Sequence, residues 1–153
     1  KRIDKKAADR VEEWIAEARS AGAKILAGGR RKGNVIEPTV ISDAARDLKV
    51  SCLEVFGPVV TLTAYKRFEE AVAAVDDSVY GLQAGVFTRD IGRIAYAFDN
   101  LEVGGVVIND YPMFRVDNMP YGGVKDSGFG REGVRYAIQE MTEPRLLVIN
   151  QNV

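Results

Sequence analysis

The sequence predicts an α/β fold in which helices cover the faces of a parallel sheet. The chain of 153 residues has the length of one domain, and its 46% apolar and 28% charged residues are typical of a globular protein. From Pro58 onward, short apolar segments alternate with segments of helical periodicity, which is the pattern of βαβ units. Right-handed crossovers between such strands would place the helices on the two faces of the sheet.

The N-terminal third is predicted to contain one helix and two strands. An amphipathic helix is expected over residues 4–21, because apolar side chains recur there at the spacing of one helix face. Strands are expected over residues 23–29 and 34–41, joined as a hairpin around residues 30–33. Pro38 lacks a backbone N–H, so it confines the second strand to a sheet edge or a bulge.

The rest of the chain is predicted to alternate between strands and helices, with a long polar loop over residues 110–127. A loop of that length in a compact domain is usually functional. Asp90 is expected to cap the N-terminus of a helix. The expected strands are 59–65, which should be buried, 82–88, 104–110 and 144–150, and the expected helices are 68–78, 90–101 and 132–142.

Composition excludes several classes of function. The chain has no histidine and a single cysteine, so a zinc site, a Ser-His-Asp triad and a Cys-His pair are not expected. The net charge of −1 lacks the basic excess of a nucleic-acid-binding protein. No apolar run approaches the roughly 20 residues that span a bilayer, and one cysteine is consistent with a reducing cytosol. We therefore expect a cytoplasmic protein without metal, nucleic-acid or membrane partners.

The segment at residues 128–133, GFGREG, matches the dinucleotide-binding pattern G-x-G-x-x-G, but its context argues against that function. A true fingerprint follows a strand directly and precedes an acidic residue about 20 positions later. Here the preceding residues, PYGGVKDS, form a polar loop, and the chain ends before that acidic position. The segment is therefore interpreted as a loop that leads into a helix.

Four segments resemble the C-terminal part of the NAD(P)-dependent aldehyde dehydrogenases. They occur in the family's order and at similar separations, and together they extend the resemblance over essentially all of the chain. The four are LEVFGPVV at 53–60, VYGLQAGVFTRD at 79–90, GGVVIND at 104–110, and the stretch from MPYGG to LLVIN at 119–150.

The resemblance implies a three-layer α/β/α catalytic domain that is truncated at its N-terminus. Residues 1–153 would form part of that domain, and residues 144–150 its C-terminal oligomerisation strand. The chain begins at Lys1 without a methionine and directly in a helix, so we expect a piece of a longer protein. The family's dinucleotide-binding domain, nucleophilic cysteine and general-base glutamate would lie upstream. The parent protein is expected to be a homo-oligomer, either a dimer or a tetramer.

The resemblance assigns contacts with the cofactor, NAD or NADP, to Glu54 and Phe56. Glu54 corresponds to the glutamate that hydrogen-bonds the nicotinamide ribose, and Phe56 to the aromatic residue that packs near the nicotinamide. Taken without the resemblance, Glu54 is a solvated loop carboxylate and Phe56 a core residue. Leu53 departs from the family, since many relatives carry a second acid there. Cys52 lies outside the family's nucleophile segment and is expected to be a buried or half-buried filler.

The resemblance assigns contacts with the aldehyde to Asn109, Arg115 and Tyr121. Asn109 ends a predicted parallel strand, where α/β folds usually place functional groups. Tyr121 matches the aromatic residue that lines the family's aldehyde tunnel. Arg115 lies where relatives carry substrate-recognising residues, and a guanidinium suits a carboxylate or phosphate. Glu132 matches a glutamate that helps to handle the hydrolytic water in some relatives, and is the segment's one auxiliary catalytic candidate.

Structural alternatives remain open for these residues. Arg115 could pair with Asp117 or with a neighbouring subunit, and Tyr121 could be a surface aromatic. Glu132 could form a salt bridge with Arg131 or Arg135.

The implied activity of the parent protein is oxidation of an aldehyde to a carboxylic acid with NAD(P)+. The segment YPMFRVDNMPYGG at 111–123 resembles that of relatives acting on lactaldehyde, glyceraldehyde 3-phosphate or related short polar aldehydes, which favours a short, hydroxylated or anionic aldehyde. This segment alone is expected to be inactive, because the nucleophile and the base would lie upstream. Two other classes stay open, a binding or assembly module without chemistry and a thiol enzyme that uses Cys52.

Overall fold

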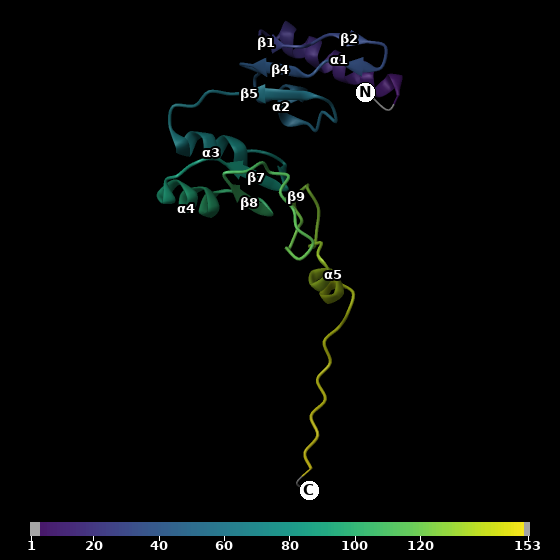
Figure 1. Cartoon of the computed structure of the whole chain (residues 1–153), viewed down its shortest axis with the longest axis vertical. Coiled ribbons are helices and arrows are strands. Elements are labelled where there is room, and N and C mark those ends of the chain that lie inside the picture. Colours follow the sequence, from purple (N-terminus) through teal and green to yellow (C-terminus); the bar gives the residue numbers. More distant parts are fainter. Residues whose placement is uncertain (1–3, 152–153) are drawn as a thin grey trace. The chain divides into compact units, whose positions relative to one another are not determined.

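The computed structural model describes residues 4–151 of the chain (Figure 1). Backbone contacts divide the chain into two compact units, Lys1–Tyr65 and Lys66–Val153, and each unit is described by itself. Both combine helices with short strands, so the chain is a mixed α/β protein.

Helix α1 (Lys5–Ser20) opens the first unit and confirms the predicted amphipathic helix. The carboxylate of Asp4 caps its N-terminus by accepting a hydrogen bond from the backbone N–H of Ala7 at 2.7 Å. At the other end Gly22 has a φ of 95°, a left-handed conformation that favours glycine and ends the helix. One stripe of the helix is fully buried and forms the floor of the unit's core: Ala8, Val11, Ile15 and Ala18.

The main sheet of the first unit has three strands in the order β1-β4-β5. β1 (Lys24–Ala27) runs antiparallel to β4 (Thr39–Ser42), and β4 runs parallel to β5 (Val59–Leu62). The strand predicted over residues 34–41 is interrupted in the structure. Pro38 lies between its two parts, β3 (Val35–Ile36) and β4.

A small hairpin of β2 (Arg31–Lys32) and β3 extends from this sheet. Arg31 fastens it to α1, since its Nη1 donates to Asp9 Oδ1 at 2.6 Å and to Glu12 Oε2 at 2.9 Å. The predicted turn region is thus confirmed, but its flanking strands are shorter, and β1 pairs with β4 beyond them.

The core of the first unit lies between α1, the sheet and the short helix α2 (Lys49–Cys52). Ile36, Ile41 and Val50 pack there against the stripe of α1. β5 departs from the buried strand that the sequence predicts, because Val60 and Leu62 are about half exposed. The reason is that β5 is one of the two edge strands of this sheet and turns alternate side chains away from the core.

The second unit is built around a βαβ element. β7 (Gln83–Val86) and β8 (Gly105–Ile108) are parallel, and α4 (Ile91–Asn100) connects them. Asp90 caps α4 as predicted, since its Oδ1 accepts from the N–H groups of Gly92 and Arg93. Helix α3 (Phe68–Asp76) packs beside α4, and the core is formed by Val72, Ala84, Ala97 and Leu101.

The remaining elements of the second unit follow the βαβ element. β6 (Tyr80–Gly81) pairs antiparallel with β9 (Val124–Lys125), a strand inside the predicted loop 110–127. Helix α5 (Val134–Glu140) confirms the predicted helix in a shorter form. The described residues form one three-stranded and three two-stranded sheets. They do not form the continuous parallel sheet of the three-layer α/β/α domain that the resemblance implies.

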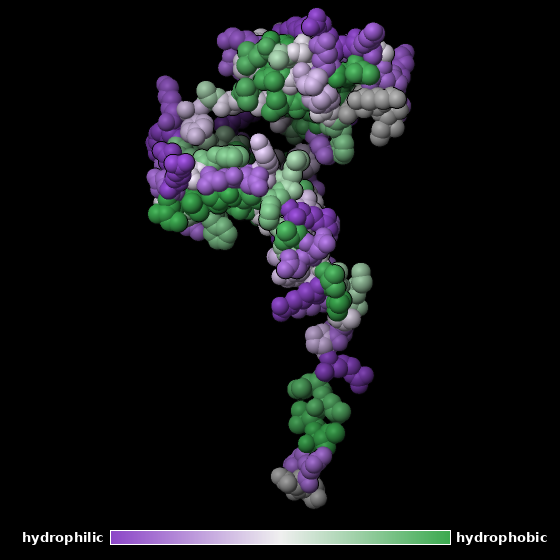
Figure 2. Space-filling model, viewed as in Figure 1, coloured by the Kyte–Doolittle hydropathy of each residue, from purple (hydrophilic) through white to green (hydrophobic). Residues whose placement is uncertain are grey.

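Residues 142–151 contain no helix or strand, in contrast to the strand expected at 144–150. Figure 2 shows a run of apolar side chains in this segment, formed by Leu146, Leu147, Val148 and Ile149. All four are largely exposed. Pairing of this segment with another subunit stays a prediction.

Candidate functional site

The loop between α2 and β5 carries the two predicted cofactor residues of the first unit. Within it, Val55 packs against the core, whereas Glu54 and Phe56 on either side of it are exposed. Arg10 of α1 holds this loop, because its Nη2 donates to the carbonyl oxygen of Val55 at 2.9 Å. The helix thus fixes the backbone from which both side chains project.

Phe56 combines exposure with an unfavourable backbone conformation. Its φ is 48°, in the left-handed region that costs a residue with a side chain about 1–2 kcal/mol. Its side chain is 66% exposed, so packing in the described structure does not account for the conformation. Strained, exposed residues of this kind concentrate at ligand sites. The structure therefore contradicts the alternative in which Phe56 is a core residue.

Gly57 explains why the loop lies so close to α1. A Cβ at this position would stand 3.1 Å and 3.2 Å from the two methyl carbons of Val11. Because Val11 is completely buried, it has little room to withdraw. The glycine therefore allows the loop to pack on the helix.

Cys52 is exposed, which makes the predicted buried or half-buried filler wrong. It is the last residue of the four-residue helix α2, in which Val50 is the buried residue. Its Sγ lies 3.5 Å from the carbonyl oxygen of Asp47, a weak hydrogen bond. The chain contains no histidine that could activate the thiol.

In the second unit, Asn109 stands at the carboxyl end of β8, where the sequence predicts it. Its φ is 58°, and its Oδ1 accepts a hydrogen bond from the backbone N–H of Thr88 at 2.8 Å. Its own N–H donates to the carbonyl oxygen of Val86 at 2.9 Å. Asn109 therefore ties together the ends of β7 and β8. Contact with an aldehyde stays a prediction for this residue.

An aromatic pair beside Asn109 was not identified from the sequence. Phe87 and Tyr111 meet edge to face, with ring centroids 5.9 Å apart, and both are largely exposed. Each follows the end of one of the two paired parallel strands. That position, an aromatic residue just past each parallel strand, is the signal that could have identified them.

Arg115, Tyr121 and Glu132 lie together in the second unit. The guanidinium of Arg115 stands 4.8 Å from the centroid of the Tyr121 ring, and its Nη2 lies 2.8 Å from Glu132 Oε2. The backbones of Tyr121 and Glu132 exchange two hydrogen bonds in an antiparallel bridge, at 3.2 Å and 2.6 Å. Three of the residues singled out from the sequence thus form one contact group.

This arrangement differs from the alternative ion pairs considered from the sequence. Arg115 pairs with Glu132 rather than with Asp117. Arg131 instead donates through Nη1 to the carbonyl oxygens of Gly123 and Gly130, at 3.0 Å and 2.7 Å.

A hollow of about 230 Å³ adjoins the contact group of Arg115, Tyr121 and Glu132. Its position depends on Gly104, where a Cβ would collide with the carbonyl oxygen of Gly122. That close approach sets the PYGG segment against the start of β8. The lining residues come from this segment, the following loop and α5: Tyr121, Gly122, Gly123, Ser127, Phe129 and Glu140, among others.

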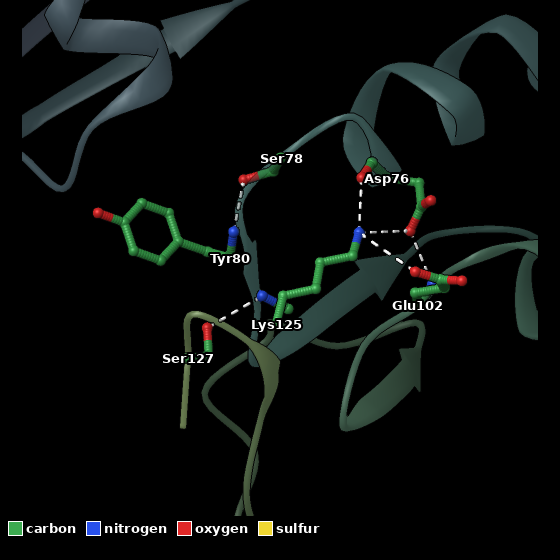
Figure 3. Close-up of polar contacts among 7 residues, drawn as sticks. Asp76, Ser78, Tyr80, Glu102, Lys125 and Ser127 are labelled. Carbon is green, nitrogen blue, oxygen red and sulfur yellow. Dashed lines mark hydrogen bonds and ion pairs between the residues drawn. The ribbon is translucent and has the colours of Figure 1, made fainter. Parts of the chain in front are cut away.

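A polar cluster around Lys125 anchors the loop that follows the PYGG segment and lines this hollow (Figure 3). Its Nζ donates to the carbonyl oxygen of Asp76 at 2.7 Å and to Asp76 Oδ1 at 3.1 Å, and lies 4.0 Å from Glu102 Oε2. The backbone N–H of Glu102, together with Lys125, lowers the pKa of Asp76 from its ordinary value. Ser127 Oγ accepts from the N–H of Gly81 at 2.9 Å. No pattern in the sequence indicated this cluster.

Two structural findings bear on other classes of function. No group of three or more potential metal ligands occurs within residues 4–151. None of the helices described there is long and apolar enough to cross a membrane.

Comparison with known sequences gives one family. The model of the aldehyde dehydrogenase family matches residues 2–147. A 3-sulfolactaldehyde dehydrogenase from Priestia megaterium is 51% identical over 145 residues, which are 95% of this chain and 30% of that protein. A lactaldehyde dehydrogenase from Methanococcus aeolicus is 44% identical over 143 residues, 94% of this chain and 30% of that protein. The chain therefore spans about 30% of the length of these curated relatives.

Solved structures give the same family. Aldehyde dehydrogenase 21 from Physcomitrella patens, in complex with the reaction product succinate, matches with a TM-score of 0.94 and 49% identity over 98% of this chain and 31% of its own. The glyceraldehyde-3-phosphate dehydrogenase GapN from Methanocaldococcus jannaschii, complexed with NADP, matches with a TM-score of 0.84 and 43% identity over 89% of this chain and 29% of its own. The chain belongs to the aldehyde dehydrogenase family of NAD(P)-dependent oxidoreductases.

Proposed function

We propose that this chain is the C-terminal part of the catalytic domain of an enzyme that oxidises a short, hydroxylated or anionic aldehyde to a carboxylic acid. In the whole protein, its short sheets would join a three-layer α/β/α domain, and residues 144–150 would pair with another subunit of a homo-oligomer. The match over residues 2–147 to the family supports this proposal. So does the exposure of the apolar residues Leu146, Leu147, Val148 and Ile149.

The observation that carries the proposal is the loop between α2 and β5, which Arg10 holds in place and which presents Glu54 and Phe56. Glu54 is exposed, so its two carboxylate oxygens can accept hydrogen bonds from a pair of ribose hydroxyls. Phe56 presents an exposed ring from a strained backbone that Arg10 and Gly57 hold in place. These residues fit a nicotinamide riboside. When bound, that group would accept a hydride from the aldehyde carbon, and Glu54 and Phe56 would orient it.

The substrate class follows from Arg115. Its exposed guanidinium stands over Tyr121 and can donate hydrogen bonds to a carboxylate, phosphate or sulfonate on the aldehyde. The names of two relatives agree with an anionic substrate, one being a 3-sulfolactaldehyde dehydrogenase and the other a structure with the product succinate. Asn109 and Tyr121 would contribute an amide and an aromatic wall to the same site.

The proposal is tested by comparing this chain with the longer polypeptide that its upstream coding sequence specifies. Both are supplied with NAD+ or NADP+ and with an anionic and an uncharged short aldehyde, and formation of reduced cofactor is measured. The longer polypeptide should turn over steadily, whereas this chain should not. Absence of turnover by the longer polypeptide with every such aldehyde would refute the proposal and favour an assembly module.

A further inference from the structure

Arg115 is held from two directions, which sets what it can still bind. The Cζ of its guanidinium lies over the Tyr121 ring, 4.8 Å from the centroid, and its Nη2 lies 2.8 Å from Glu132 Oε2. Glu132 cannot easily move its backbone away, because the bridge to Tyr121 fixes it by two hydrogen bonds. The cation, the ring and the carboxylate therefore form one preorganised group.

The guanidinium still has donors to offer. It carries five N–H groups, and the contact with Glu132 uses one edge of it. Within residues 4–151, Nε and Nη1 of Arg115 have no hydrogen-bond partner. The side chain is 48% exposed, so an incoming anion can reach these donors.

The charge of Glu132 opposes such an anion. An incoming carboxylate must either displace Glu132 from Arg115 or approach while Glu132 remains, next to a like charge. In both cases the negative charge of Glu132 weakens binding of the anion. An uncharged hydroxyl group on an aldehyde meets no such repulsion. The Glu132 side chain is 61% exposed, so solvent screening keeps the effect moderate.

We infer that Glu132 is the internal counter-ion of Arg115 and sets the selectivity of this site between anionic and uncharged aldehydes. The inference rests on the proposed function, because it requires that Arg115 meets the substrate. It gives Glu132 a role in substrate choice that is separate from handling the hydrolytic water.

The kinetic test uses the full-length protein and a ratio of two substrates. The kcat/KM for succinate semialdehyde is divided by the kcat/KM for butanal, so that a common change in the chemical step cancels. Glu132→Gln should raise this ratio roughly two- to fivefold, the range expected from a half-exposed ion pair. In an Arg115→Gln background, the same change should raise the ratio less, because only the direct repulsion between Glu132 and the anion is then removed. An unchanged or lower ratio, or an equal rise without Arg115, would overturn the inference.

A binding measurement separates failure of the inference from failure of the proposed function. Succinate is titrated into the full-length protein, and its Kd is followed through the guanidinium NMR signals of Arg115. Glu132→Gln should lower the Kd roughly two- to fivefold. Glu140→Gln is the matched control, since Glu140 lines the same hollow but bonds to the backbone of Arg131, and it should leave the Kd unchanged.

The combined outcomes are distinct. Tighter succinate binding by the Glu132 variant without any aldehyde oxidation would refute the enzyme and leave the counter-ion role intact. If the full-length protein oxidises aldehydes but binds succinate as tightly as its Glu132→Gln variant does, the counter-ion role alone is refuted.

Discussion

The guanidinium of Arg10 donates a hydrogen bond to the carbonyl oxygen of Val55 across 2.9 Å, and so joins helix α1 to the loop that carries Glu54 and Phe56. The same guanidinium lies 4.9 Å from the centroid of the Trp14 ring. The hydrogen bond connects α1 to a loop far along the sequence, and the contact with Trp14, which lies on the same helix, helps to hold the guanidinium in place. The side chains of this loop are those that the proposed cofactor would meet.

Replacing Arg10 should loosen this loop. Arg10→Ala removes a partly buried charged hydrogen bond and a cation–π contact, and should lower the free energy of unfolding by about 1–2 kcal/mol. Chemical denaturation of this chain measures the change. Arg30→Ala is the control, because Arg30 forms an exposed pair with Glu37 and its loss should cost less than about 1 kcal/mol. Equal losses for the two variants would contradict a special role of Arg10.

Phe56 should separate stability from function. Phe56→Gly removes an exposed ring from a backbone with φ of 48°, which glycine adopts without strain, so the chain should lose no stability. Phe56→Val places a β-branched residue in the same conformation and should cost about 1 kcal/mol or more. Thermal unfolding compares the two variants.

In the full-length protein, both Phe56 variants should weaken cofactor binding, by about tenfold or 1.4 kcal/mol. Titration with NAD+ and NADP+ measures the Kd. Unaltered affinity would show that the exposed ring does not contact the cofactor.

Asp76 should make the stability of the second unit depend on pH in the acid range. The N–H of Glu102 and the charge of Lys125 hold its pKa below the ordinary value of 3.8, so the unfolded chain takes up this proton first as the pH falls. Asp76 therefore contributes stability above pH values near 3.8, and this stability is lost as the pH falls through the lowered pKa.

The expected result for Asp76→Asn is a lower stability at neutral pH and a shallower loss of stability on acidification. Denaturation midpoints at a series of pH values below neutrality measure it. Asp99→Asn is the matched control, since Asp99 on α4 is exposed and its side chain makes no hydrogen bond or ion pair within the described residues. If the Asp76→Asn variant loses stability on acidification as steeply as the unmodified protein does, the contribution assigned to Asp76 is refuted.

Local signals explain what the sequence predicts well. Helices α1 and α4 follow from periodic apolar residues and from caps at Asp4 and Asp90, all of which act over a few neighbouring positions. The break at Pro38 is local too, but whether a proline shifts a strand to an edge or divides it depends on the partner strand.

Long-range contacts explain what the sequence misses. Glu132 contacts Arg115 because its backbone bridge with Tyr121 places it beside that arginine. Charge alone suggested the arginines nearest to it in the sequence, Arg131 and Arg135. Lys125 lies on β9, and the pairing of β9 with β6 places it near Asp76 and Glu102, which are distant in the sequence. The exposure of Cys52 likewise depends on which side of α2 faces the core.

Arg115 gives the most direct test of the substrate class. Arg115→Ala in the full-length protein should raise the KM for an anionic aldehyde about 10- to 100-fold, at about 1.4 kcal/mol for each factor of ten, because the carboxylate loses its charged partner. The KM for an uncharged aldehyde of similar length should change little. The variant also frees Glu132, but both groups are about half exposed, so thermal stability should fall by less than about 1 kcal/mol. A loss of stability with equal KM values for both aldehydes would mean that Arg115 serves the loop and not the substrate.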